Sequence, residues 1–333
     1  MFYSERFTTD IIGTSAFGLG CNSFKEPDSP FRLKAMKFFR LTRLGALRTA
    51  FVNNCPNLAR TLTFRTISKD VGDFFGKVIE DTVNYRENNG VVRRDFLQLL
   101  IDIKNGVGQE ENGEKGDKKT LTMSEIAAQS FIFFLAGYET SSATMTFALY
   151  QLAINPDIQD RVREEIETVL SKHNGEMTYE AVTEFKYMEQ VINETLRLYP
   201  PLPMILRSCS ADYKVPGENL VIEKGTRVHI PVMGIHYDEE YYENPYCFDP
   251  DRFSEENKKK IKKYTYMPFG EGPRICIGMR FGLMQSKIGL ASILRKFRVT
   301  LNERTKLPLT FCKTSVFINA EGGVWLNLEK IRS

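Results

Sequence analysis

The feature that most constrains the fold is the long apolar stretch from Ile126 to Ile154. A membrane-spanning helix requires about 20 consecutive residues that are predominantly apolar. This stretch is interrupted near its middle by Gln129, Glu139 and two adjacent serines. It therefore predicts a long helix that is buried in a protein core and carries a polar patch. We expect no membrane span in this sequence, and the polar run after Met1 indicates no secretory signal.

Three further helices are predicted by apolar residues at spacings of three and four. The first follows Asn155-Pro156, a good cap and first-turn pair. The second runs through residues 185–195 and must end before Pro200-Pro201. The third begins directly after Cys276 and continues through Leu294.

The β content is expected to be small. Residues 220–222 and 227–230 are rich in β-formers and flank Glu-Lys-Gly-Thr, which predicts a hairpin between them. Residues 105–120 contain four glycines and many charges, which predicts a mobile surface loop. The fold class is therefore mainly α with small β-sheets.

Composition excludes several classes of protein. The chain has 333 residues, of which 42% are hydrophobic, so it can bury a large core. The formal charge of +3 favours neither nucleic acid nor an acidic partner. Six cysteines without a Cys-x-x-Cys pair indicate reduced thiols rather than disulfides or a zinc site. The three histidines (173, 229 and 236) are interpreted as structural polar residues, since no carboxylate motif accompanies them.

The strongest local signal is the segment Phe-Gly-Glu-Gly-Pro-Arg-Ile-Cys-Ile-Gly, from Phe269 to Gly278. Its glycines allow tight turns and a close approach to a flat ligand. Cys276 precedes a predicted helix, whose positive dipole end favours a thiolate. A thiolate is a soft ligand suited to haem iron, and Arg274 is placed to reach an anionic propionate. A lone cysteine is more often a small buried hydrophobe, but the surrounding pattern argues against that interpretation.

With this segment the sequence resembles the cytochrome P-450 family, and residues 7–18 resemble a segment of its insect microsomal, xenobiotic-metabolising members. Ala-Gly-Tyr-Glu-Thr, at residues 136–140 of the long apolar helix, is similar to the family's oxygen-side motif. The resemblance implies that Gly137 makes room for oxygen, and that Glu139 and Thr140 relay protons to it. The plainer interpretation is a helix with one exposed acid and a threonine bonded back to its own backbone.

Glu194 and Arg197 lie three residues apart and can pair on one helical face. The resemblance implies that this pair is buried, that Arg252 of the Pro-Asp-Arg-Phe segment joins it, and that the three residues hold the cysteine loop. It also implies that Arg207 contacts a haem propionate. Residues expected to line the substrate pocket are Met204 to Leu206, Phe317, Ile318, Phe131, Phe133 and Phe134.

The resemblance begins at about Phe7 and implies one catalytic domain over residues 1–333, the C-terminal two-thirds of a complete member. The expected fold is therefore a cytochrome P-450 fold that lacks its N-terminal part, including a membrane anchor and one wall of the haem pocket. Efficient catalysis by this chain alone is not expected.

The implied activity is insertion of one oxygen atom from O2 into lipophilic substrates, either xenobiotics or endogenous lipids and hormones. The implied cofactor is haem b with Cys276 as the axial thiolate, and the implied electron donor is NADPH-cytochrome reductase. That donor is expected to dock on the basic run at 258–263, although a solvated face is the plainer interpretation. The expected location of the full-length protein is the cytosolic face of the endoplasmic reticulum membrane, recovered as microsomes, with no nucleic-acid partner.

Two alternatives remain open. One is a truncated, non-catalytic haem-thiolate protein. The other is a haem-thiolate isomerase or dehydratase that needs no external electrons, against which the acid–alcohol pair at residues 139–140 argues.

Overall fold

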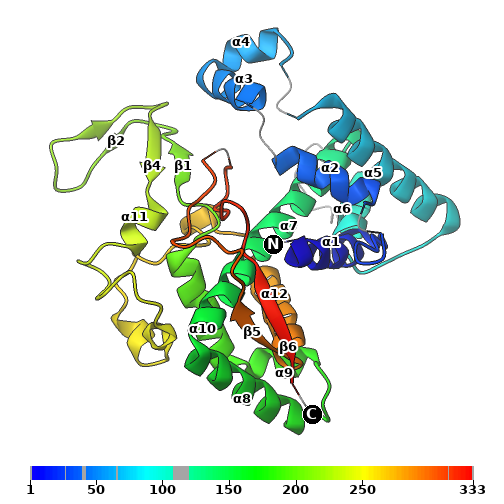
Figure 1. Ribbon diagram of the computed structural model, residues 1–333. Coiled ribbons are helices and arrows are strands. Elements are labelled where there is room, and N and C mark those ends of the chain that lie inside the picture. The colour runs from blue at the N-terminus through cyan, green and yellow to red at the C-terminus, as the bar shows by residue number, and fades with distance from the viewer. Residues whose placement is uncertain are drawn as a thin grey trace. The chain divides into compact units, whose positions relative to one another are not determined.

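The computed structural model describes residues 2–26, 28–39, 43–64, 67–107, 120–313 and 315–331 (Figure 1). Most of the loop expected at 105–120 lies outside these ranges. The chain forms two compact units, one comprising residues 1–142 and 312–316 and the other residues 143–311 and 317–333. The expectation of a single catalytic domain stays a prediction.

The first unit is helical in its described part. Its helices are α1 (Phe2–Phe17), α2 (Pro30–Phe39), α3 (Arg43–Asn54), α4 (Pro56–Thr61), α5 (Lys69–Asn89), α6 (Phe96–Lys104) and the first part of α7 (Met123–Ile154). In α5, apolar side chains four residues apart face the core, namely Val71, Phe75, Ile79 and Val83. The helix ends at Gly90, whose φ of 62° is the left-handed conformation that glycine adopts easily.

The core of this unit is rich in aromatic rings. Phe131 and Phe134 of α7 are 8% and 1% exposed, and both rings contact Phe75, with centroids 4.9 Å and 5.3 Å apart. Phe133 stacks on Phe96 at 3.8 Å. In the described structure Phe131 and Phe134 lie in the core of this unit and Phe133 packs against it, as aromatic residues on a helix commonly do. That these three side chains line a substrate pocket stays a prediction.

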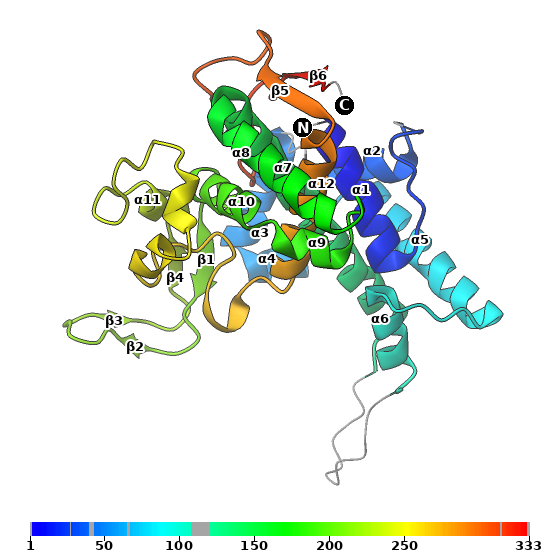
Figure 2. The same ribbon diagram turned by 90° about the horizontal axis from the view of Figure 1, so that it is seen from below.

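The second unit contains the end of α7 and most of the remaining helices. These are α8 (Pro156–Lys172), α9 (Tyr179–Glu184), α10 (Lys186–Leu198), α11 (Val232–His236) and α12 (Met279–Leu294), with short 3-10 turns η1 (Pro250–Phe253), η2 (Asn257–Lys260) and η3 (Gly272–Arg274). Figure 2 shows α8, α9, α10 and α12 gathered into one group. Helix α10 is buried along almost its whole length, so its polar residues must find partners inside the protein.

The predicted helices are present, and the start of the third differs, since α12 begins at Met279 instead of directly after Cys276. The long apolar stretch forms α7, and Pro156 occupies the first turn of α8. Helix α10 ends two residues before Pro200, as the proline pair requires. None of the helices in the described ranges is long and apolar enough to cross a membrane.

The small sheets of the second unit are two-stranded and antiparallel. The strands are β1 (Ile205–Ser208), β2 (Tyr213–Lys214), β3 (Val221–Ile222), β4 (Arg227–Ile230), β5 (Phe297–Leu301) and β6 (Leu326–Lys330). Strand β1 pairs with β4, β2 with β3, and β5 with β6. Figure 2 shows β2 and β3 extending away from β1 and β4 as one ribbon.

The two strands of the predicted hairpin are present, but they do not pair with each other. Residues 221–222 and 227–230 are strands, yet they pair with β2 and β1 rather than with each other. The chain reverses instead at Pro216-Gly217, where the amide of Glu218 donates to the carbonyl of Val215 and Gly217 has a φ of 81°. Proline followed by glycine is the signature of a type II turn, so the signal was present in the sequence.

Candidate functional site

The segment from Met267 to Gly278, here called the cysteine loop, is closed by its own backbone. The amide of Cys276 donates to the carbonyl of Phe269 at 2.9 Å, and the amide of Gly270 donates to the carbonyl of Met267 at 3.1 Å. Gly270 and Gly272 have φ angles of 73° and 74°, in the left-handed region that favours glycine. The glycines expected to allow tight turns at these two positions do so.

Cys276 presents a free thiol at the surface of the second unit. Helix α12 begins at Met279, not directly after the cysteine, and its N-cap is Gly278. The carbonyl of Cys276 accepts from the amide of Met279 at 3.4 Å, so the cysteine lies just ahead of the first helical turn. The neighbouring side chains are apolar and exposed, at 43% for Ile275 and 90% for Ile277. The thiol is therefore accessible and flanked by apolar surface.

Two arginines lie close to this loop. Arg207 of β1 donates from Nη1 to the carbonyl of Leu206, and a Cβ placed on Gly270 would lie 3.9 Å from its Nη2. Arg274 belongs to η3 within the loop itself, and both arginines are exposed. In the part of the chain that the structure describes, neither guanidinium has an ion-pair partner. They supply two positive charges beside an apolar surface, which suits a ligand with an apolar body and anionic groups.

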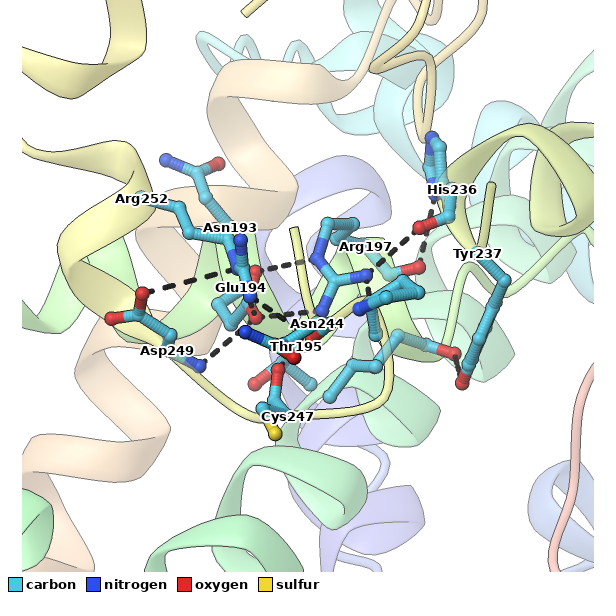
Figure 3. Close-up of polar contacts among 12 residues, drawn as sticks. Asn193, Glu194, Thr195, Arg197, His236, Tyr237, Asn244, Cys247, Asp249 and Arg252 are labelled. Atoms are coloured by element: carbon cyan, nitrogen blue, oxygen red, sulfur yellow. Dashed lines mark hydrogen bonds and ion pairs between the residues drawn. The ribbon is translucent and has the colours of Figure 1, made fainter. Parts of the chain in front are cut away.

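The predicted ion-pair cluster is present and buried (Figure 3). Arg197 donates to both carboxylate oxygens of Glu194 at 2.8 Å, and both side chains are 0% exposed. Arg252 lies 3.4 Å from the same carboxylate, and the amide of Asp249 donates to it at 3.0 Å. Burial raises the pKa of Glu194, while the Arg197 guanidinium acts in the opposite direction.

The remaining donors of Arg197 hold the chain that leads to the loop. They reach the carbonyls of His236 and Pro245 at 2.8 Å and that of Cys247 at 3.1 Å. Arg252 also donates to the carbonyl of Asn244 at 3.1 Å. The cluster therefore braces residues 236–252 directly, and it reaches the cysteine loop through other residues.

Those other residues are His236, Tyr242 and Tyr266. His236 is 0% exposed, and its Nε2 accepts from the amide of Met267 at 3.1 Å. Tyr266 donates to the carbonyl of Asn193 at 3.0 Å, and Tyr242 donates to the carbonyl of Thr265 at 3.1 Å. Sequence reasoning placed His236 correctly among structural polar residues but did not connect it to the loop, because nothing local in the sequence reveals a partner 31 residues away.

The α7 residues lie in the first unit. Thr140 donates from Oγ1 to the carbonyl of Ala136 at 2.6 Å, as the plainer interpretation expected, whereas Glu139 is only 3% exposed. A Cβ on Gly137 would lie 2.8 Å from Cδ1 of Ile12, so the absent side chain allows α1 to approach α7. The roles of these three residues in oxygen activation stay predictions.

The expected pocket residues of the second unit divide into two groups. Met204 and Leu206 are 44% and 60% exposed, so their side chains are available to a ligand. Ile318 is 5% exposed and belongs to an apolar core with Phe147 and Tyr150, and its assignment to a pocket wall stays a prediction.

A separate surface cavity of about 240 Å³ shares no residue with the cysteine loop. It is lined by Asp157, Ile158, Arg161, Tyr187, Phe248, Asp249, Pro250 and Asp251. Arg161 lies over the Tyr187 ring at 3.7 Å and pairs with Asp251 at 3.1 Å, so its charge is already satisfied.

The sequence of the chain is similar to a known protein family over nearly its whole length. The Cytochrome P450 family model matches residues 1–327. The chain is 46% identical over 327 residues to Probable cytochrome P450 6a21 and 48% identical over 328 residues to Cytochrome P450 6a2, both of Drosophila melanogaster. It is 45% identical over 331 residues to Cytochrome P450 6A1 of Musca domestica. Each alignment covers 98% of this chain and 64% of the relative, so the chain spans less than two thirds of the length of these proteins. With the family model matching nearly the whole sequence, the chain belongs to the cytochrome P450 family.

Proposed function

We propose that this chain carries the haem-thiolate part of a monooxygenase that inserts one oxygen atom from O2 into lipophilic substrates. The substrate classes that we propose are xenobiotics and endogenous lipids or hormones. The observation that carries the proposal is the accessible Cys276 thiol, on a loop held by its own backbone, next to two arginines without ion-pair partners in the described ranges. This donor set matches the chemistry of haem b, a flat apolar ring with two anionic propionates and an iron that accepts a thiolate.

The residues present fit that cofactor. Cys276 would supply the axial thiolate, Arg207 and Arg274 would meet the propionates, and Phe269 and Ile277 would cover the ring. Free exposure of an apolar side chain is unfavourable by roughly 1.5–3 kcal/mol relative to burial, so covering Ile277, at 90% exposure, favours binding. When bound, haem supplies the oxidising chemistry, and the protein provides the ligand, the protons and the apolar surroundings.

The proton path that we propose uses Glu139 and Thr140. The Thr140 hydroxyl donates to the carbonyl of Ala136 at 2.6 Å, and a hydroxyl group can both donate and accept hydrogen bonds. To pass a proton onward the hydroxyl must turn away from that carbonyl. Glu139, which is 3% exposed, would resupply it from a position shielded from bulk water.

The partner that we propose is NADPH-cytochrome reductase, at the cytosolic face of the endoplasmic reticulum membrane. Support comes from the exposed basic run that begins within η2 and continues past it, where Lys258, Lys259, Lys260, Lys262 and Lys263 are all solvent-accessible. Lys262 pairs with Glu240 at 3.6 Å, and the other four have no ion-pair partner in the described ranges. Such a run can steer an acidic protein surface at low ionic strength.

The test is the absorbance of the haem-loaded chain after reduction and treatment with carbon monoxide. We expect a thiolate-type Soret band, and we expect Cys276→Ser to abolish that band. Cys55→Ser is the matched control, because Cys55 is also an exposed free thiol and should leave the spectrum unchanged. A spectrum that is indifferent to Cys276→Ser, or that shows no thiolate band in the unaltered chain, contradicts the proposed cofactor site.

A second measurement separates the monooxygenase from an isomerase or dehydratase. Substrate turnover by a monooxygenase requires NADPH, the reductase and O2, whereas the alternatives require none of them. Turnover that continues without electrons would exclude the proposed reaction while leaving the haem site intact.

A further inference from the structure

His236 is a buried residue whose two ring nitrogens are both used. Nδ1 lies 3.0 Å from the carbonyl oxygen of Arg197, and Nε2 lies 3.1 Å from the amide nitrogen of Met267. A carbonyl can only accept and an amide N–H can only donate, so Nδ1 must carry the proton and Nε2 must be bare. The two partners therefore fix the neutral Nδ1–H tautomer without reference to any other group.

The two hydrogen-bond partners of His236 belong to the buried ion-pair cluster and to the cysteine loop. Arg197, at the centre of the buried ion-pair cluster, donates back from Nη1 to the carbonyl of His236 at 2.8 Å, so the two residues exchange hydrogen bonds (Figure 3). Met267 begins the cysteine loop, and its carbonyl accepts from the amide of Gly270 at 3.1 Å. The path therefore runs from the ion pair through the imidazole to the first turn of the loop.

The ring is also held on its face. Tyr266 stacks on His236 with centroids 5.5 Å apart and planes 23° apart, and its hydroxyl is anchored to Asn193 of α10. The imidazole thus has little freedom to rotate away from Met267. Its position is determined by α10 and transmitted to the loop.

We propose that His236 is a positioning residue that couples the Glu194–Arg197 ion pair to the cysteine loop by accepting the Met267 amide, and so sets the placement of the Cys276 thiolate. The part of this inference that concerns the thiolate rests on the proposed haem site. The part that concerns the loop does not, because the hydrogen bonds are those of the polypeptide alone.

The two ring nitrogens of His236 have different roles, and substitutions can remove the hydrogen bond of one nitrogen while keeping that of the other. In His236→Asn the amide nitrogen takes the place of Nδ1 and can still donate to Arg197, but the side chain is too short to reach Met267. In His236→Gln the amide oxygen extends to the place of Nε2 and can accept from Met267. Tyr237→Phe is the matched control. It removes the hydrogen bond from the Tyr237 hydroxyl to the carbonyl of Leu198, at the end of α10, and leaves the hydrogen bond to Met267 in place.

The first measurement is backbone hydrogen exchange, by mass spectrometry, of peptides that cover residues 265–278 in the full chain. We expect exchange of the Met267 amide to accelerate about tenfold or more in His236→Asn, and to stay within about threefold of the unaltered chain in His236→Gln and Tyr237→Phe. Equal acceleration in the Asn and Gln variants, or none in either, overturns the proposal.

The second measurement is the thiolate fraction of the Soret band in the haem-loaded, carbon-monoxide-treated chain. His236→Asn should lower that fraction and His236→Gln should restore it, which a merely space-filling role does not predict. If the unaltered chain shows no thiolate band, the proposed haem site fails while the exchange result still decides the role of His236. If exchange changes but the thiolate fraction does not, the coupling to Cys276 is wrong.

The unaltered chain offers a test that needs no variant. Burial lowers the pKa of His236 to about 4, and the groups that face the ring are Arg197, Tyr242 and Tyr266. A protonated Nε2 cannot accept from Met267, so exchange of that amide, corrected for its intrinsic pH dependence, should rise as the pH falls toward 4. Constant protection over that range contradicts the proposal even where every His236 variant fails to fold.

Discussion

Arg197 uses all five of its guanidinium N–H donors inside the protein, two on Glu194 and three on backbone carbonyls. A buried charge of this kind is stable only while its carboxylate partner is present, because desolvation of an unpaired ion is unfavourable by several kcal/mol. Glu194 in turn accepts from the amide of Asp249, so this pair determines how residues 236–252 fold back on α10.

We predict that Glu194→Gln lowers the free energy of unfolding by about 3–5 kcal/mol, because an amide leaves the Arg197 charge uncompensated. Urea unfolding followed by circular dichroism measures the change. Glu240→Gln is the matched control: its partner Lys262 is 3.6 Å away, both side chains are more than 60% exposed, and a change below about 1 kcal/mol is expected. Similar losses in the two variants would contradict the assigned role of burial.

One buried residue, His236, makes the free energy of unfolding depend on pH. His236 has its pKa lowered from 6.5 to about 4 by burial, so between these values the unfolded chain binds a proton that the folded chain excludes. Stability from this residue is therefore fully present above pH 6.5 and is lost as the pH falls toward 4, by about 3 kcal/mol in all. Comparing urea midpoints at pH 7 and pH 4.5 for the unaltered chain and His236→Gln isolates this contribution. An identical pH dependence in the two proteins would show that other groups account for it.

At the scale of elements, helices approach one another only as closely as their smallest residues allow. Gly137 lies in α7 where Ile12 of α1 packs against it, whereas around Gly76 of α5 no other described part of the chain, apart from its own helix, comes within 4 Å of the place of a Cβ. The two glycines have the same intrinsic helix propensity, and only the packing around them differs.

We predict that Gly137→Ala is destabilising by about 1–2 kcal/mol, since the new methyl group would lie 2.8 Å from Cδ1 of a buried Ile12 and outweighs the gain in helix propensity. Ile12→Val, which removes that Cδ1, should recover part of the loss in the double variant. Gly76→Ala should instead stabilise the protein by up to about 1 kcal/mol. Thermal unfolding of the four variants tests the prediction, and stabilisation by Gly137→Ala would refute it.

At the scale of the whole molecule, the apolar surface next to Cys276 is one that the described fold leaves uncovered. Ile275, Ile277 and Phe281 are 43%, 90% and 37% exposed although they come from one short segment. Apolar side chains gathered in this way mark a surface that a ligand or partner covers. The two compact units each have their own apolar core, so this exposure does not reflect a shortage of core.

We predict that the haem-free chain binds the dye anilinonaphthalene sulfonate and that haem displaces part of it. Ile277→Asn should reduce the part of the fluorescence that haem removes. Ile132→Asn is the matched control, because Ile132 is 58% exposed but lies on α7, far along the chain from the cysteine loop. Haem-insensitive fluorescence, or equal effects of the two variants, would contradict the assignment of this surface to haem.

The sequence by itself determined the features that depend on neighbours along the chain. Apolar spacing located α8, α10 and α12, since a helical face is decided by residues three and four positions apart, and the long apolar stretch located α7. Gly270 and Gly272 were identified because their conformations are set within the loop itself. The pairing of Glu194 with Arg197 followed from their spacing on one helical face, with the burial of the pair and the joining of Arg252 implied by the family resemblance.

Only the tertiary structure decided the features that depend on distant neighbours. It paired β1 with β4 and β2 with β3, because strand pairing is set by which segments meet in space. It placed Phe131 and Phe134 in the core of the first unit, a position that the spacing of apolar rings along a helix does not decide. It also joined His236 to Met267 across 31 residues. A hydrogen bond of that kind leaves no periodic pattern in the sequence, because its geometry exists only once α10, α11 and the cysteine loop are packed together.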